Sequence, residues 1–230
     1  MKLHPAVRAL LPVDPNAYQA AQAWPAAQAY AAAFCELNGI PVPRRYVTEP
    51  ITPGLKPFDP RGYGEARIAK WLIYVNVRNC PRPIRGKPVR AWSFTGYKAD
   101  RTVPGVTLHE LGHLVHAHLL RTKGVGERTT WPVVDRALWR VVESREPKLT
   151  SYEPNEGETF AEAFRLFALN PELLREGRPY RWQLMVDLGL KPLHSLPWTE
   201  VLRHAHPAYH QAARNWMWRA PASTPQLQLP

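Results

Sequence analysis

The chain has few of the features that mark secreted or membrane-spanning proteins. Only two cysteines, Cys35 and Cys80, occur in 230 residues, so the sequence contains neither a disulfide framework nor zinc-ribbon spacing. No segment reaches the roughly 18 consecutive apolar residues that a membrane span needs. The short apolar stretch 6–13 is interrupted by Arg8 and Pro12, unlike a secretory signal. We therefore expect a cytoplasmic protein, bacterial or encoded by a phage, with two buried thiols.

Positive charge is plentiful, but no segment concentrates it. Lys and Arg number 30 against 19 Asp and Glu, which gives a net charge of +11. A charge of this size allows weak association with polyanions, including nucleic acids, through counterion release. The basic residues are scattered, with no run of five or more, and no nucleic-acid-recognition motif accompanies them. A nucleic-acid-associated protein is therefore one alternative interpretation of the chain.

Apolar periodicity and the positions of the prolines predict an α+β fold. We predict helices over 15–38 with a bend at Pro25, 104–121, 132–146, 156–169 and 197–219, strands over 69–77 and 89–97, and a short strand within 40–49. A Pro- and Gly-rich loop is expected over 51–65. Strands precede most of the helices along the chain, which favours α+β over repeating βαβ units.

The same pattern predicts one domain over residues 1–219. It would consist of an N-terminal helix and sheet part, 1–103, followed by a second and mostly helical part, 104–219. Residues 220–230 carry no charge and little periodicity, so we expect them to form a frayed, flexible tail.

The strongest functional signal is the segment His109-Glu110-Leu111-Gly112-His113. On a helix, residues four apart lie on one face, so His109 and His113 can both direct imidazole nitrogens toward one metal ion. Glu110 then lies beside the ion, where its carboxylate can accept a proton from an attacking water. This H-E-x-x-H pattern is typical of zinc hydrolases. Pro104 and Gly105 precede it at the predicted helix start, which is the context that the motif requires.

The third zinc ligand is harder to identify from spacing. Catalytic zinc sites usually take three protein ligands, and the metzincin pattern is excluded because positions 116 and 119 are His and Leu. The remaining candidates downstream of the motif are His116, Glu156, Glu158 and Glu162, and Cys35 could in principle cap the metal. Glu158 and Glu162 share one face of an otherwise apolar helix, where carboxylates are costly to bury unless a cation faces them.

Two segments together resemble zinc proteases of the anthrax lethal factor type and the pro–pro endopeptidases. Their first motif, His-Glu-Phe-Gly-His, resembles residues 109–113. Their second segment, a Ser-Tyr pair followed by Asn-Glu-x-Glu and Phe-Ala-Glu-Ala-Phe, resembles Ser151-Tyr152, Asn155-Glu156-Gly157-Glu158 and Phe160-Ala161-Glu162-Ala163-Phe164. The resemblance covers about residues 105–167, and Tyr152 stands one residue closer to Glu158 than its counterpart in lethal factor.

The resemblance implies a zincin-like metalloprotease fold, in which a small mixed or antiparallel sheet packs on the metal helix. It also implies that Glu158 is the third ligand of one Zn²⁺ per chain, that the Tyr152 hydroxyl lies near the scissile carbonyl, and that Glu162 supports a ligand histidine from behind.

The expected function is therefore zinc-dependent endopeptidase activity on a protein or peptide substrate, with Glu110 as general base. A strand over 71–77 or 92–97 could present a sheet edge to an extended substrate. The alternative is a non-catalytic protein, such as a phage structural or host-takeover factor, that keeps zinc for stability or associates with nucleic acid.

Overall fold

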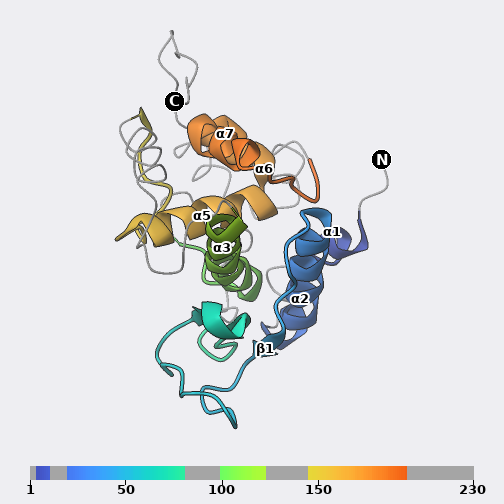
Figure 1. The fold of residues 1–230 in the computed structure, drawn as a ribbon, viewed down its shortest axis with the longest axis vertical. Helices are drawn as coiled ribbons and strands as arrows, with labels where there is room; N and C mark the ends of the chain where they lie inside the picture. The colour runs from blue at the N-terminus through green and yellow to red at the C-terminus, as the bar shows by residue number, and fades with distance from the viewer. Residues whose placement is uncertain (1–3, 11–19, 81–98, 123–144, 196–230) are drawn as a thin grey trace, which may run out of the picture.

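The computed structural model describes residues 4–10, 20–80, 99–122 and 145–195, which are coloured in Figure 1. Its elements are α1 (Pro5–Leu10), α2 (Ala20–Leu37), β1 (Arg45–Val47), β2 (Gly64–Arg67), the 3₁₀ helix η1 (Ile68–Lys70), β3 (Leu72–Val75), α3 (Val103–Thr122), α5 (Glu156–Leu169), α6 (Pro171–Gly177) and α7 (Pro179–Asp187). This composition confirms the predicted α+β class. The predicted strand 89–97, most of helix 132–146, helix 197–219 and the tail 220–230 lie outside the described residues.

Helix α3 occupies the centre of the described structure. It crosses α5 on one side and packs against α2 and the strands β2 and β3 on others, while α6 and α7 lie beyond α5 (Figure 1). Its burial explains the apolar sequence around the motif: Leu108, Leu111 and Leu114 are all fully buried in the main core. The leucines on the buried side of this helix therefore anchor the motif in the main core.

A mixed three-stranded sheet packs against α3, as expected. Its strand order is β1-β3-β2, with β1 parallel and β2 antiparallel to the central strand β3. Ile73 and Val75 of β3 face the main core, whereas Leu72 and Tyr74 belong to a second cluster beneath Phe58. Burial of both faces explains why this strand is apolar at every position rather than alternating.

Two predictions about the strand over 69–77 were wrong. The strand begins only at Leu72, because residues 68–70 form η1 and Trp71 adopts a left-handed conformation with φ 51°. This tight turn is needed to reverse the chain between antiparallel neighbours. In the described sheet β3 lies between β1 and β2, so its residues 72–75 have no free edge for a substrate. In the described sheet the edge beside α3 belongs to β2.

The helix predictions agree closely with the described structure. Helix α2 contains Pro25 and ends at Asn38-Gly39 as predicted, where Gly39 has a φ of 63°. The Ile40 N–H donates to the Cys35 carbonyl, which closes the helix end in the geometry that favours glycine. Helices α3 and α5 match the predicted 104–121 and 156–169 to within a residue. Among the described helices, none combines the length and apolar character of a membrane span.

Candidate metal centre

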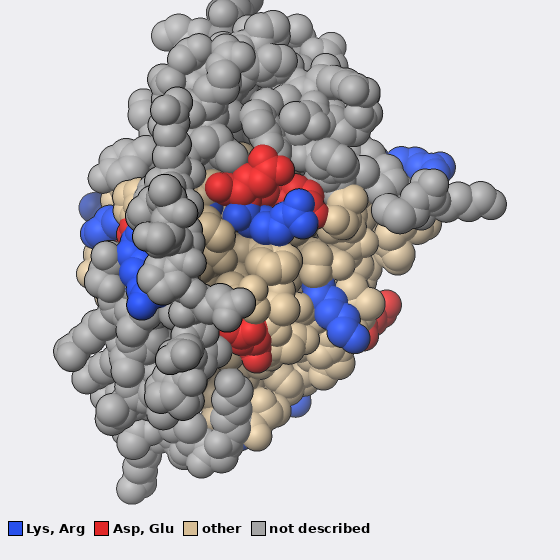
Figure 2. Space-filling model, turned by 90° about the horizontal axis from the view of Figure 1, so that it is seen from above, with Lys and Arg blue, Asp and Glu red and all other residues tan. Residues whose placement is uncertain are grey.

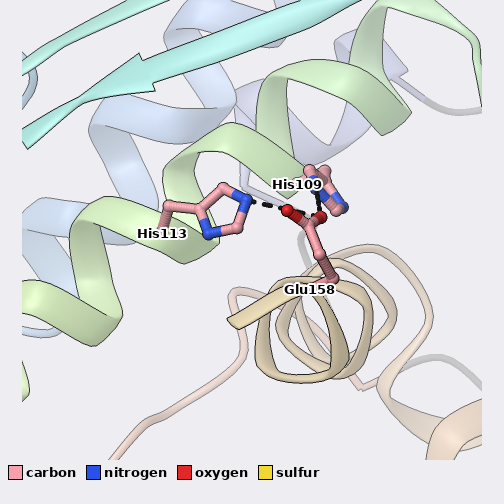
Figure 3. A group of neighbouring side chains, drawn as sticks. All are labelled: His109, His113 and Glu158. Atoms are coloured by element: carbon pink, nitrogen blue, oxygen red, sulfur yellow. Dashed lines mark hydrogen bonds and ion pairs between the residues drawn. The ribbon is translucent and has the colours of Figure 1, made fainter. Parts of the chain in front are cut away.

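Three potential ligand atoms converge where α3 crosses α5 (Figure 3). His109 and His113 project from α3, and Glu158 projects from the first turn of α5. The Glu158 Oε2 atom lies 3.0 Å from His109 Nε2 and 3.7 Å from His113 Nε2. All three ligand atoms fall within 4.8 Å of one another. The structure thus brings together the two histidines of the motif and the glutamate that the resemblance implied.

These distances suit a tetrahedral metal ion. Ligand atoms at the usual zinc–nitrogen and zinc–oxygen distances of about 2.0–2.2 Å are about 3.3–3.5 Å apart in a tetrahedron. The two measured separations, 3.0 and 3.7 Å, lie on either side of this value. Two imidazoles and one carboxylate also form a donor set typical of catalytic zinc, because a fourth position is left for water or substrate. The residues present therefore fit the proposed ion.

Gly112, inside the motif, allows the two helices to come this close. A Cβ atom at this position would lie 2.9 Å from the Ala161 Cα and 3.1 Å from the Phe164 ring. Both neighbours belong to α5, and the first is backbone, so a larger residue would push α5 away from α3. The histidines belong to α3 and Glu158 belongs to α5. The distance between the two helices where they cross therefore sets the separation of the ligand atoms.

A cap at the start of α5 places Glu158. The Asn155 side chain accepts a hydrogen bond of 3.0 Å from the Glu158 N–H, and the backbone carbonyl of Asn155 accepts one from the Thr159 hydroxyl. Asparagine is one of the preferred residues at this position because its side chain satisfies a free N–H of the first turn. The carboxylate of Glu158 is therefore carried by a fixed turn, not by a loop.

A series of buried charged side chains contacts the Nδ1 side of the His109 ring and fixes its orientation. Glu162 Oε1 lies 2.8 Å from His109 Nδ1, on the opposite side of the ring from Glu158. Arg165 makes two hydrogen bonds to the Glu162 carboxylate, at 3.1 and 2.8 Å, and lies 3.8 Å from Asp100. All of these side chains are almost fully buried. An Nδ1–H bond to Glu162 fixes the ring and leaves Nε2 free to act as a ligand.

The charges of the two carboxylates make the His109 position strongly cation-attracting. Burial works against a charged His109, but the hydrogen bonds with Glu158 and Glu162 outweigh it and raise the pKa of His109 to about 10. Burial likewise works against a charged Glu158, yet the hydrogen bonds with His109 and His113 lower the Glu158 pKa to about 2. In this arrangement the positive charge of a protonated His109 offsets that of Glu158, and a bound cation would do the same.

Glu110 lies beside this cluster and lines a pocket of about 260 Å³. The pocket is lined by Gly62, Tyr63, Gly64, Ala99, Asp100, Arg101, Val106, His109, Glu110, Tyr152 and Glu162. Burial raises the pKa of Glu110, although His109 and His113 partly oppose this effect. Its carboxylate lies against β2, where a Cβ atom on Gly64 would be only 2.7 Å from Glu110 Oε1. A carboxylate with a raised pKa can both accept and release a proton near neutral pH.

Tyr152 lines the same pocket. Its ring centre lies 5.9 Å from that of His109, and the residue is 48% exposed. Burial, followed by the negative charges of Glu158 and Glu110, raises the pKa of its hydroxyl. The hydroxyl therefore stays protonated at neutral pH and can donate a hydrogen bond into the pocket.

The other candidate ligands lie elsewhere. The His116 ring stacks on Phe160 at 4.4 Å, and burial lowers the pKa of His116 to about 3. Cys35 is buried in the main core, and neither it nor Glu156 belongs to the metal-binding group found among the described residues.

Sequence reasoning did not identify several residues of this region, among them Tyr63, Gly64, Asp100, Arg101 and Arg165. Arg165 could have been recognised as the cation facing Glu162, because it follows three positions later on an aromatic helix. No signal in the sequence marked Asp100 or Arg101.

Comparisons of the chain with protein-family models, curated proteins and solved structures found no significant match.

Proposed function

We propose that this chain is a zinc-dependent metalloendopeptidase with a zincin-like fold. The observation that carries the proposal is the convergence of His109, His113 and Glu158 beside Glu110 and an open pocket. A site that only stabilised the fold would need no carboxylate at position 110, and it would be closed by a fourth protein ligand. We further propose that the protein binds one Zn²⁺ and acts on protein or peptide substrates.

Each residue has a distinct task in this proposal. His109, His113 and Glu158 hold the zinc, which supplies Lewis acidity to polarise a carbonyl and acidify water. Glu110 accepts the proton of the attacking water and delivers it to the leaving amine nitrogen. Its close contact with the Gly64 backbone of β2 keeps the carboxylate oriented. Glu162 accepts the Nδ1 proton of His109 and fixes the tautomer that binds metal.

Strand β2 offers a backbone edge for an extended substrate. The Asn76 N–H donates to the Tyr63 carbonyl, so in the alternating antiparallel pattern Gly64 and Ala66 point their backbone groups away from β3. The Ala66 backbone lies near Glu110 and partly opposes the rise in its pKa, and Gly64 lines the pocket. A peptide paired here would pass over Glu110. The Tyr152 hydroxyl would then donate to the oxygen of the scissile carbonyl.

The alternative function is a non-catalytic, zinc-stabilised or nucleic-acid-associated protein. Its support is the net charge of +11. On the face drawn in Figure 2, the described basic side chains occur in small groups, several of them beside acidic side chains. Salt-dependent retention on a DNA column would support the alternative, and retention that is equal on heparin and DNA would indicate charge alone.

The deciding experiment combines metal content with peptide cleavage. We expect purified protein to contain about one zinc per chain, and we expect Glu158→Ala and His113→Ala to lose it. Glu110→Gln should keep both fold and zinc, yet reduce cleavage of a random peptide mixture about 10²–10⁴-fold, because the proton acceptor is removed.

Circular dichroism and zinc analysis of Glu110→Gln provide the matched control. A wild-type protein that binds no zinc after incubation with the metal would refute the proposal. Full cleavage activity in Glu110→Gln would refute the proposed role of this carboxylate.

A further inference from the structure

Arg101 is the charged side chain of the pocket lining that no metal or catalytic role explains. It is exposed, it precedes α3, and it lines the pocket together with Glu110 and Tyr152. The other charged groups of the described lining are accounted for. Asp100 and Glu162 both face the buried Arg165, and Glu110 lies beside the proposed zinc.

The guanidinium of Arg101 is held in one place. It stacks over the Tyr63 ring at 4.7 Å and donates a hydrogen bond of 3.1 Å to the Tyr63 hydroxyl. The ring contact and the hydrogen bond already restrict the conformations of this long side chain. Binding a ligand therefore costs less conformational entropy than it would for a free arginine. Tyr63 itself adjoins β2, the strand that contacts Glu110.

The backbone that carries Arg101 is fixed as well. The Asp100 carboxylate accepts a hydrogen bond of 2.9 Å from the Thr102 N–H and pairs with Arg165. A Cβ atom on Gly105 would lie 2.4 Å from the Asp100 carboxyl carbon, so this carboxylate is wedged against the first turn of α3. Asp100 is buried against α3 and Arg165, and its neighbour Arg101 lines the pocket. The contacts of Asp100 therefore restrain the backbone from which Arg101 projects.

In the described part of the chain, Arg101 has no carboxylate partner. Among the described residues its guanidinium makes a hydrogen bond and a ring contact with Tyr63 alone, and its charge also acts on the Tyr152 hydroxyl. An arginine that is positioned but not paired presents its planar donors to a ligand, and carboxylates are the groups that match this geometry best. We propose that Arg101 is a specificity residue, and that the preferred substrates place a carboxylate in the pocket beside the scissile bond. This inference rests on the proposed peptidase function.

Two chemical sources could supply that carboxylate. One is an Asp or Glu side chain within the substrate, and the other is the free C-terminus of a peptide. The net charge of +11 would assist the approach of either, because it attracts negatively charged ligands over longer distances. The experiment therefore treats the two sources separately.

The probes are mixtures of short random peptides, acetylated at the N-terminus, with Glu, Gln or Lys at one central position. Each mixture is made with a C-terminal amide and with a free acid. For wild type we expect kcat/KM about tenfold higher for Glu than for Gln peptides, the factor of one partly exposed charged hydrogen bond. Arg101→Gln should remove this preference, and Arg101→Glu should favour the Lys peptides instead. A preference for free acid over amide would identify the C-terminus as the source.

Arg45→Gln is the matched control. It removes the same charge from β1, at the edge of the sheet opposite to β2, and should keep the wild-type preference. A binding measurement with zinc-loaded Glu110→Gln and the same peptides, followed by fluorescence anisotropy, gives a second readout that does not depend on turnover. It should show the same order, Glu above Gln, and lose it when Arg101→Gln is added.

The outcomes separate the two proposals. Cleavage of Glu and Gln peptides at equal rates, or an equal preference in wild type and Arg101→Gln, would overturn the role of Arg101 and leave the peptidase proposal standing. Failure to bind zinc and to cleave any mixture would overturn the peptidase proposal itself, and the inference about Arg101 with it.

Discussion

Two buried ionic networks in this protein look alike in composition but differ in geometry. The Arg165 network consists of Asp100, Glu162 and Arg165 and ends on His109. The Arg181 network consists of Glu146, Glu153 and Arg181. In each, a fully buried arginine of one helix faces two acidic side chains. Glu162 belongs to the same helix as Arg165, whereas Asp100, Glu146 and Glu153 come from segments without regular structure.

The two networks differ in whether the guanidinium group makes hydrogen bonds. Arg165 holds Glu162 through two hydrogen bonds, and Glu162 in turn contacts the His109 ring. The guanidinium of Arg181 has no hydrogen-bond partner in the described structure and lies 3.6–3.7 Å from its carboxylates.

In the Arg181 network, the carboxylates instead accept backbone N–H groups. Glu146 accepts those of Tyr180 and Arg181 at the start of α7, and Glu153 accepts that of Thr150. The first network therefore orients a side chain, whereas the second orients backbone near Tyr152. A buried ion pair is weak evidence for stability by itself, and only its hydrogen bonds tell what it positions.

Replacing each arginine by methionine should separate these roles most strongly. Arg165→Met leaves two buried carboxylates without a cation, and we expect a loss of about 3–5 kcal/mol in the free energy of unfolding. It should also weaken zinc binding. Arg181→Met should cost less stability, because Glu146 can take up a proton, and it should leave zinc affinity unchanged. Urea unfolding of zinc-free protein and competition with a chelating dye measure the two quantities.

Arg165→Lys provides the test if the methionine variant does not fold. It keeps the positive charge but loses the two-point contact with Glu162. Zinc affinity equal to that of wild type in this variant would show that the Arg165 network does not position His109.

A second difference between the networks should appear as a pH dependence of stability. Burial raises the pKa of Glu146 from its ordinary value of 4.5 to about 7, although the N–H of Tyr180 and the charge of Arg181 oppose the shift. Because the pKa is raised in the folded state, the contribution of Glu146 is fully present below pH 4.5 and is lost as the pH rises toward 7. The expected loss is up to about 3 kcal/mol.

The measurement is urea unfolding of wild type and Glu146→Gln from pH 4 to 8 with a chelator present. Glutamine keeps the hydrogen-bond acceptor but does not titrate, so the difference between the two curves isolates Glu146. A difference that stays constant across this range would contradict the assignment.

The smallest expected effect compares one glutamate from each network. Glu162→Gln should fold and still contact His109, but it loses the charge that supports the ligand ring, and zinc affinity should fall about 10–100-fold. Glu153→Gln removes a buried charge of the same kind from the other network and should leave zinc affinity at the wild-type value. Equal zinc affinities in the two variants would show that charge behind His109 does not matter.

Part of this structure could be predicted because local sequence decides it. Helix α5 was predicted with correct ends, since Asn155 caps its start and apolar residues recur with helical spacing. The strand 69–77 was predicted too long, because Ala69, Lys70 and Trp71 continue into a mostly apolar strand in the sequence but belong to a turn that only the pairing of β2 with β3 requires. Its central place in the sheet was also not predictable, since strand order depends on contacts between distant segments.

The sequence by itself determined which side chains share a helix face: His109 with His113, and Glu158 with Glu162. Only the tertiary structure decided that the two glutamates contact the same histidine, His109, with Glu158 at its Nε2 and Glu162 at its Nδ1. This arrangement depends on how closely α3 and α5 approach at Gly112. Helical periodicity repeats every turn and specifies a face, whereas the separation between two faces is set by packing of the whole core.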